Sequence, residues 1–189
     1  RKLESAYRYV NRTRGPAGRH ISAEQPAIGP LYVSRMFSDL RPADVLAAAD
    51  RIRPFIKRTP LVRSDKLSSI AGGDVYLKFE NEQTTGSFKL RGAYTAIMAS
   101  ERAAREHGVV AHSSGNHGHA VADAAALLGV RAVVVVPRTA PAVKTDAIEY
   151  YGAELIRVEP TLAARVAATE ELAARHGYVP IPPFDDRAV

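Results

Sequence analysis

The chain has no cysteine, which excludes a disulfide framework and a metal site built from thiolates. It also has no apolar run that approaches the ~18 residues of a membrane span, and no stretch typical of a secretory signal. We therefore expect a cytoplasmic protein without a membrane partner. Its hydrophobic share of 46% and charged share of 24% are ordinary for a globular protein, and 189 residues are enough to bury a sizeable core.

The formal net charge of +6 is distributed unevenly. Residues 1–58 contain 12 Lys/Arg against 5 Asp/Glu, whereas residues 59–189 contain 14 against 15. A folded nucleic-acid binder carries its basic patch on the fold, and neither a zinc-finger motif nor an RNA-binding motif accompanies this N-terminal excess. We therefore predict that nucleic acid is not a partner.

The first 40 residues differ in composition from the rest. They contain Pro16, Pro26 and Pro30, scattered glycines and no sustained hydrophobic period, which predicts a disordered extension. Six basic residues among the first twenty leave a transit peptide as an alternative, although the helical amphipathicity of this segment is poor for such a peptide.

From residue 41 onward, predicted helices and strands alternate at short spacing. The helices are predicted over residues 42–53, 87–105, 116–128, 142–151 and 162–176, and the strands over residues 75–80, 109–112, 132–136, 154–158 and 178–181. This alternation predicts an α/β fold of three layers, in which helices cover both faces of parallel sheets. We expect residues 41–107 to belong to a larger domain, residues 108–183 to form a small α/β domain, and residues 184–189 to return towards the larger one.

The stretch T-T-G-S-F-K-L-R-G-A, residues 84–93, is the candidate centre of chemistry. The apolar run 75–79 before it predicts a buried strand, and the apolar spacing after it predicts a helix capped by Ser87 or Thr85. Lys89 then lies in the first helical turn, where the positive end of the helix dipole disfavours a charged ammonium. A lysine that is partly neutral is a nucleophile and can form a Schiff base with a carbonyl. The alternative for a lysine taken alone is a solvated side chain.

A second motif, S-S-G-N-H-G at residues 113–118, lies between a predicted strand and a predicted helix. Gly115 and Gly118 allow a close approach between backbone and ligand. The start of the helix supplies unpaired N–H groups that suit an anion such as an amino-acid carboxylate. Ser114 and Asn116 add a hydroxyl and an amide. The alternative is a plain strand-to-helix turn in which these two side chains act as caps.

Three histidines, His112, His117 and His119, lie within eight residues and raise the alternative of a metal site. Neither a carboxylate nor a further histidine has matching spacing, so we predict no metal.

Together, these motifs resemble a known family. The segments that carry the resemblance are K-F-E at residues 78–80, T-G-S-F-K-L-R-G-A, S-S-G-N-H-G, and V-V-V-P-R-T-A-P-A-V-K at residues 134–144. They are similar to the fold-type II enzymes that use pyridoxal 5′-phosphate (PLP), within these the threonine dehydratase (threonine ammonia-lyase) and serine racemase family. The resemblance covers residues 40–189 and implies the tryptophan synthase beta-like fold, of which this chain is the N-terminal portion, incomplete at the C-terminus.

The resemblance also implies roles for individual residues. It implies that Lys89 holds PLP as a Schiff base and removes the Cα proton of the substrate, that Phe88 packs near the ring, and that Asn116 hydrogen-bonds the 3′-oxygen. Ser114 matches the acid/base on the second face in the racemase. The positions matched to substrate binding are Ser113, Ser114, Gly115, Asn116 and His117.

The implied activity is conversion of L-threonine or L-serine to a 2-oxo acid and ammonia, by a full-length enzyme that is a homo-oligomer. Serine racemase, or another PLP lyase acting on hydroxy-amino acids, is the alternative within the class. A catalytically inactive fragment or a partner-binding module is the alternative of another class, because the family's phosphate-binding glycine-rich loop lies beyond Val189. We expect the 189-residue chain alone to bind PLP weakly. A nucleotide-binding domain is disfavoured, because no G-x-G-x-x-G follows a first strand.

Overall fold

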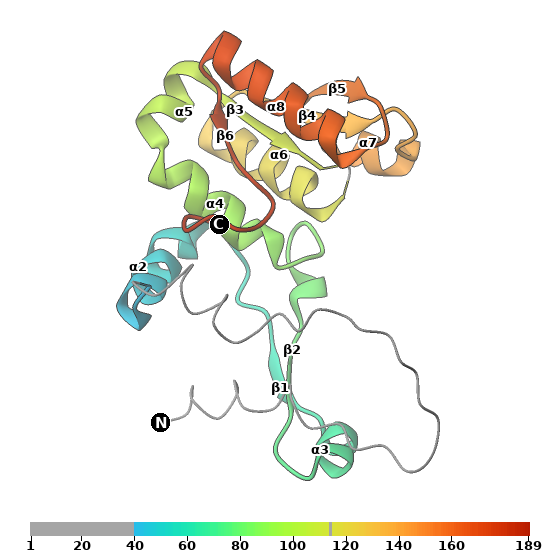
Figure 1. Cartoon of the computed structure of the whole chain (residues 1–189). Helices are drawn as coiled ribbons and strands as arrows, with labels where there is room; N and C mark the ends of the chain where they lie inside the picture. The colour runs from blue at the N-terminus through green and yellow to red at the C-terminus, as the bar shows by residue number, and fades with distance from the viewer. Residues whose placement is uncertain (1–39, 114) are drawn as a thin grey trace, which may run out of the picture. The chain divides into compact units, whose positions relative to one another are not determined.

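A four-stranded parallel sheet carries the main core. The computed structural model describes residues 40–113 and 115–189; residues 1–39 of the predicted extension over residues 1–40, and Ser114, lie outside the described residues. The strand order is β5-β4-β3-β6, and every neighbouring pair is parallel (Figure 1). Their bounds are β3 Val109–His112, β4 Ala132–Pro137, β5 Glu154–Val158 and β6 Val179–Pro180. The parallel sheet predicted from the alternation of elements is confirmed.

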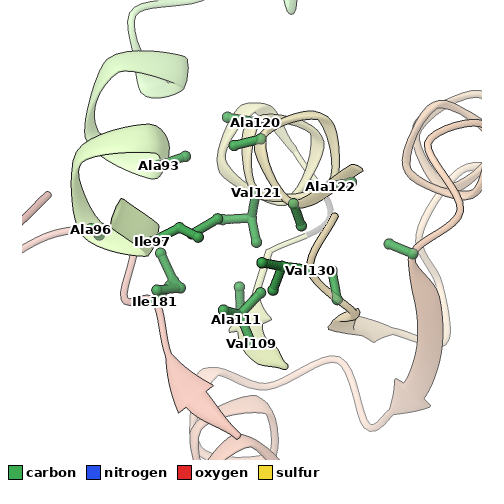
Figure 2. Packing of buried hydrophobic residues seen from close by; sticks show 14 of the residues in the cluster. Ala93, Ala96, Ile97, Val109, Ala111, Ala120, Val121, Ala122, Val130 and Ile181 are labelled. Carbon is green, nitrogen blue, oxygen red and sulfur yellow. The ribbon is translucent and has the colours of Figure 1, made fainter. Parts of the chain in front are cut away.

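Helices cover both faces of this sheet, as predicted. They are α4 (Lys89–Ala99), α6 (Asn116–Leu128), α7 (Ala142–Glu149) and α8 (Leu162–His176). Alternate residues of a strand point to opposite faces. Ala111, which Figure 2 labels, and Val134 therefore pack in the core that includes α4 and α6, whereas Val110 and Val133 pack in a second core with α8. The valine run of β4 suits a strand that is buried on both faces.

The division into two domains at residue 108 stays a prediction. In the structure, Ala93 and Ile97 of α4 lie in the same core cluster as Val121 of α6, so the helix on the N-terminal side of that boundary packs directly against the small sheet's layer (Figure 2).

The helix predicted over residues 87–105 is divided in the structure. α4 ends at Ala99, and α5 (Glu101–His107) begins after Ser100. The backbone of Ser100 (φ −113°, ψ 26°) lies outside the helical region, and its N–H donates to the carbonyls of both Ala96 and Ile97. The helical spacing of apolar residues continues through this break, so the periodicity of the sequence alone predicts one continuous helix.

The prediction of a buried strand at residues 75–79 is wrong. β2 (Tyr76–Lys78) pairs with β1 (Leu61–Arg63) in an antiparallel ribbon. Leu61 is 63% exposed and Tyr76 55% exposed. A two-stranded ribbon is buried only where a further layer covers one of its faces, and within the described residues this sheet has no third strand. The run is therefore apolar in sequence but open to solvent here.

The remaining elements are short. They are α2 (Pro42–Ile52), η2 (Arg53–Phe55), α3 (Asp65–Ala71) and η3 (Glu80–Glu82). Across residues 40–113 and 115–189, the structure has no helix with the length and apolar character needed to cross a bilayer.

A buried polar contact joins α4 to α6. The hydroxyl of Tyr94 donates to Oδ2 of Asp123 over 3.2 Å, and the two residues are 0% and 2% exposed. The ring of Phe55 stacks on Tyr94 with the centroids 5.1 Å apart. Burial raises the pKa of Asp123, and the hydrogen bond from Tyr94 opposes that rise. Loss of the carboxylate would therefore leave the buried hydroxyl of Tyr94 without its acceptor.

We expect Asp123→Ala to lower the free energy of unfolding of the full-length protein by about 1–3 kcal/mol, because a buried hydroxyl loses its partner and a small cavity forms. Urea unfolding measures the change. Asp146→Ala, at an exposed position of α7, is the matched control and is expected to stay within about 0.5 kcal/mol. Equal midpoints for the two variants would show that the contact between α4 and α6 contributes nothing.

Candidate functional site

The candidate site lies where β3 and β6 end. The two strands are parallel neighbours, so their carboxyl ends share one edge of the sheet. β3 leads into the loop 113–115 and then α6, while β6 leads into residues 181–183, which we call the strap. In open α/β sheets this edge is where ligands bind. Figure 1 shows the chain after β6 passing along α4, the helix that begins at Lys89.

Lys89 reaches this edge from α4. Its Nζ donates a hydrogen bond to the carbonyl oxygen of Pro183 in the strap, and it lies 5.3 Å from the centroid of the Phe88 ring. Lys89 is half-buried, whereas Phe88 is 59% exposed. The structure therefore brings the predicted lysine and its neighbouring ring to the same place, with the ring free to contact a ligand.

The predicted side-chain cap of α4 is wrong. Phe88, the residue before the helix, already has helical angles (φ −64°, ψ −17°), and no side chain caps α4. A capping Ser or Thr needs an extended backbone from which its oxygen reaches back to the N–H groups. Instead, Oγ1 of Thr85 and Oγ of Ser87 are buried and have no hydrogen-bond partner among the described residues.

A two-way amide contact holds the segment before Lys89. The side chain of Gln83, 3% exposed, accepts from the N–H of Lys57 over 2.9 Å and donates to the carbonyl of the same residue over 2.9 Å. Because both amide atoms are satisfied by one backbone unit, the start of the lysine loop is tied to a segment 26 residues earlier.

An ion pair also holds the same loop. Glu80 accepts two hydrogen bonds from Arg91 of α4, at 2.9 Å from Nε and 2.8 Å from Nη2, and a third from Thr59. The bond from Arg91 lowers the pKa of Glu80 despite partial burial. A bidentate pair of this kind fixes the relative orientation of the two side chains, in addition to its electrostatic attraction. Arg91 therefore anchors its helix to η3.

The S-S-G-N-H-G loop is closely packed. Oγ of Ser113 accepts from the N–H of Gly115 over 3.2 Å, and α6 begins at Asn116 without a side-chain cap. A Cβ on Gly118 would lie 2.1 Å from the carbonyl oxygen of Ser113. The exposed Asn116 and the uncapped first turn leave polar groups that suit an anion. Ser114 lies outside the described residues.

His117 is buried rather than open to a ligand. It is 3% exposed, and its Nε2 lies 2.8 Å from the carbonyl oxygen of Ile181 in the strap. A carbonyl only accepts, so Nε2 carries the proton. Burial lowers the pKa of His117 to about 4, with the charge of Lys89 acting in the same direction. The ring is therefore neutral near pH 7, and its buried Nδ1 has no partner among the described residues.

The other two histidines have separate surroundings. Burial lowers the pKa of both His112 and His119, and the ring of His119 lies 5.3 Å from that of Tyr151. Over residues 40–113 and 115–189, the structure contains no group of three or more His, Cys, Asp or Glu that could hold a metal ion.

No sequence pattern marks the strap as part of the candidate site. The contacts of Lys89 and His117 there are made to main-chain carbonyls of Pro183 and Ile181. Every residue has such a carbonyl, so no sequence pattern marks one as an acceptor. The pairs Gln83–Lys57 and Glu80–Arg91 were missed for a similar reason, because each joins segments that only the fold brings together.

The fold and the site define an α/β protein with a lysine amine and an anion-suited loop beside one sheet edge. A family model described as pyridoxal-phosphate dependent enzyme matches residues 52–189, and the chain belongs to this family. The resemblance found in the motifs is confirmed.

Within the family, the chain is similar to several individual enzymes. The chain is 43% identical over 142 residues to an L-threo-3-hydroxyaspartate ammonia-lyase of Saccharomyces cerevisiae, covering 75% of the chain and 44% of the relative. It is 44% identical over 147 residues to a catabolic L-threonine dehydratase of Staphylococcus aureus, covering 77% and 42%. The crystal structure of serine racemase from Dictyostelium discoideum matches with a TM-score of 0.69 and 42% identity, covering 76% and 47%. The chain thus spans less than half the length of these proteins.

We expect Gly118→Ala to destabilise the full-length protein by about 3 kcal/mol or more, because the obstacle to the new Cβ is backbone that cannot move aside cheaply. Gly115→Ala is the matched control in the same loop. Its Cβ would lie 4.0 Å from the nearest heavy atom, Oγ of Ser113, so we expect a change below about 1 kcal/mol. Urea unfolding of both variants checks the pair, and a Gly118→Ala protein as stable as its control would contradict the packing of the loop.

The depressed pKa of His117 predicts a dependence of stability on pH. The unfolded chain binds a proton at its usual pKa of about 6.5, whereas the folded protein binds it only near a pKa of about 4. The contribution of the neutral His117 ring to the free energy of unfolding is therefore fully present above pH ~6.5. It is lost as the pH falls towards ~4, by about 3 kcal/mol in total. Unfolding of the parent and of His117→Gln at pH 7.5 and 4.5 measures it. A stability difference between them that does not shrink at pH 4.5 would be the contrary result.

Proposed function

We propose that the full-length protein that contains this chain is a PLP-dependent ammonia-lyase, which converts L-threonine, L-serine or a related hydroxy-amino acid to a 2-oxo acid and ammonia. The observation that carries this proposal is the position of Lys89 at the start of α4, with its Nζ at the sheet edge where the S-S-G-N-H-G loop begins α6. The relatives named as ammonia-lyase and dehydratase support it.

The described residues fit PLP. The half-buried amine of Lys89 suits covalent attachment, the exposed ring of Phe88 lies 5.3 Å from it, and Asn116 offers an exposed amide at the start of α6. The buried hydroxyls of Thr85 and Ser87, without partners among the described residues, leave donors in the lysine loop itself. When bound, PLP supplies an aldehyde for attachment and a conjugated ring that accepts electrons from the substrate's Cα.

The chain's own residues have three tasks in this reaction. The N–H groups at the start of α6 bind the substrate carboxylate, since the positive end of the helix favours an anion there. The Nζ of Lys89, when it is free, takes the proton from Cα as a general base. Glu80 and Gln83 keep the lysine loop in place through Arg91 and Lys57, so that the amine is oriented before the substrate arrives.

Serine racemase is the second candidate, because the racemase from Dictyostelium discoideum is 42% identical to this chain, against 44% for the dehydratase. Ser114 is then the acid/base on the face of Cα opposite Lys89. The variant Ser114→Ala of the full-length protein separates the racemase from the ammonia-lyase activity. We expect it to abolish the formation of D-serine but to spare the release of ammonia from the L-substrate. A cytoplasmic location and a homo-oligomeric assembly remain predictions from the sequence.

Replacement of the lysine tests the proposed function directly. We expect Lys89→Ala in the full-length protein to reduce ammonia release from L-threonine and L-serine by a factor of about 10² to 10⁴, the usual contribution of a general base. Borohydride reduction in the presence of PLP, followed by peptide mass spectrometry, is expected to place the covalent label on Lys89. Lys144→Ala, on the exposed surface of α7, is the control and keeps both properties. A label on Lys78 or Lys144 would refute the assignment.

A further inference from the structure

The strap, residues 181–183, receives two of the side chains of the candidate site. The carbonyl of Ile181 accepts from Nε2 of His117, and the carbonyl of Pro183 accepts from Nζ of Lys89. The first donor lies on α6 and the second on α4. Two helices that pack against each other are therefore also connected through one short piece of backbone.

The covalent structure of the strap explains why side chains hold it. Ile181 still follows the sheet, because its N–H donates to the carbonyl of Val110 over 2.8 Å and its side chain is 2% exposed. The next two residues are Pro182 and Pro183, which have no N–H and cannot continue the ladder. Beyond Ile181 the strap's polar contacts depend on its carbonyls, and these need donors from elsewhere in the protein.

His117 is the rigid one of the two donors. Its ring is 3% exposed and sits in the first turn of α6, whereas Lys89 is half-buried and has a long, flexible side chain. Because the Ile181 carbonyl can only accept, the neutral ring has one tautomer, with the proton on Nε2. The hydrogen bond from His117 is thus defined in direction and shielded from water.

We infer that His117 is a positioning residue for Lys89: its Nε2–H fixes the strap at Ile181, and the strap's Pro183 carbonyl in turn holds the Lys89 amine at the sheet edge. This role differs from the contact with the substrate that the motif implies for His117. The consequence for catalysis rests on the proposed function, whereas the mechanical link can be tested without any cofactor.

The test uses the reactivity of Lys89 in the full-length protein without PLP. Acetic anhydride acetylates free amines, and mass spectrometry gives the rate at Lys89 relative to exposed Lys144. In His117→Gln, the amide nitrogen reaches the place of Nε2, so the bond to the strap and the rate at Lys89 are expected to stay within about twofold of the parent. In His117→Asn the amide is too short, and we expect Lys89 to react about fivefold faster, the factor that loss of one net hydrogen bond supplies.

A second variant keeps the test decisive if His117→Asn does not fold. Pro183→Gly leaves α6 unchanged and loosens the strap itself, so it is also expected to raise the rate at Lys89 about fivefold. Unchanged rates in every folded variant of this set would overturn the inference. Equal increases in His117→Gln and His117→Asn would overturn it too, because the effect would then not depend on the Nε2–H donor.

Reduction of the PLP-treated variants with borohydride separates this inference from the proposed function. A covalent label on Lys89 together with unchanged acetylation rates means that the proposed function stands and the positioning role of His117 fails. A label on another lysine together with the expected acetylation rates means that the proposed function fails, while the link between His117, the strap and Lys89 stands.

Discussion

The packing of α4 against α6 is the contact on which the candidate site depends. Leu90 and Ala93 of α4 and Ala120 and Val121 of α6 are fully buried in one cluster, of which Figure 2 labels Ala93, Ala120 and Val121. Alanines on both helices allow a close approach, and close packing leaves little freedom for either axis. Since α4 begins at Lys89 and α6 begins at the S-S-G-N-H-G loop, this apolar contact sets the spacing of two polar helix starts.

Polar contacts then fix the orientation of these two helix starts. The buried bond from Tyr94 to Asp123 fixes the two helices along their length, and the pair Glu80–Arg91 orients the turn before Lys89. A buried polar contact that is fully satisfied specifies one arrangement, because any other leaves a charged or hydroxyl group without a partner. The apolar core therefore supplies the stability of the site, and the polar contacts supply its orientation.

The fold was largely predictable from the sequence. The predictions that were wrong have identifiable physical causes. The valines of β4 predict a strand whatever surrounds them, and the structure has that strand. The apolar run 75–79 predicts burial just as clearly, but burial needs a covering layer, and the described residues do not provide one for the β1–β2 ribbon. Ser87 and Thr85 suit a helix cap by residue type, but Phe88 is already helical, so neither oxygen has the geometry for it.

The sequence by itself determined the family, the order of the elements from residue 109 onward and the lysine at the start of α4, because motifs and periodicity are properties of neighbouring residues. Only the tertiary structure decided what Lys89 and His117 contact. Their acceptors are carbonyls at Pro183 and Ile181, 94 and 64 residues away along the chain. A carbonyl carries no side-chain signature, and its role is set only by the neighbour that folding brings within hydrogen-bonding distance.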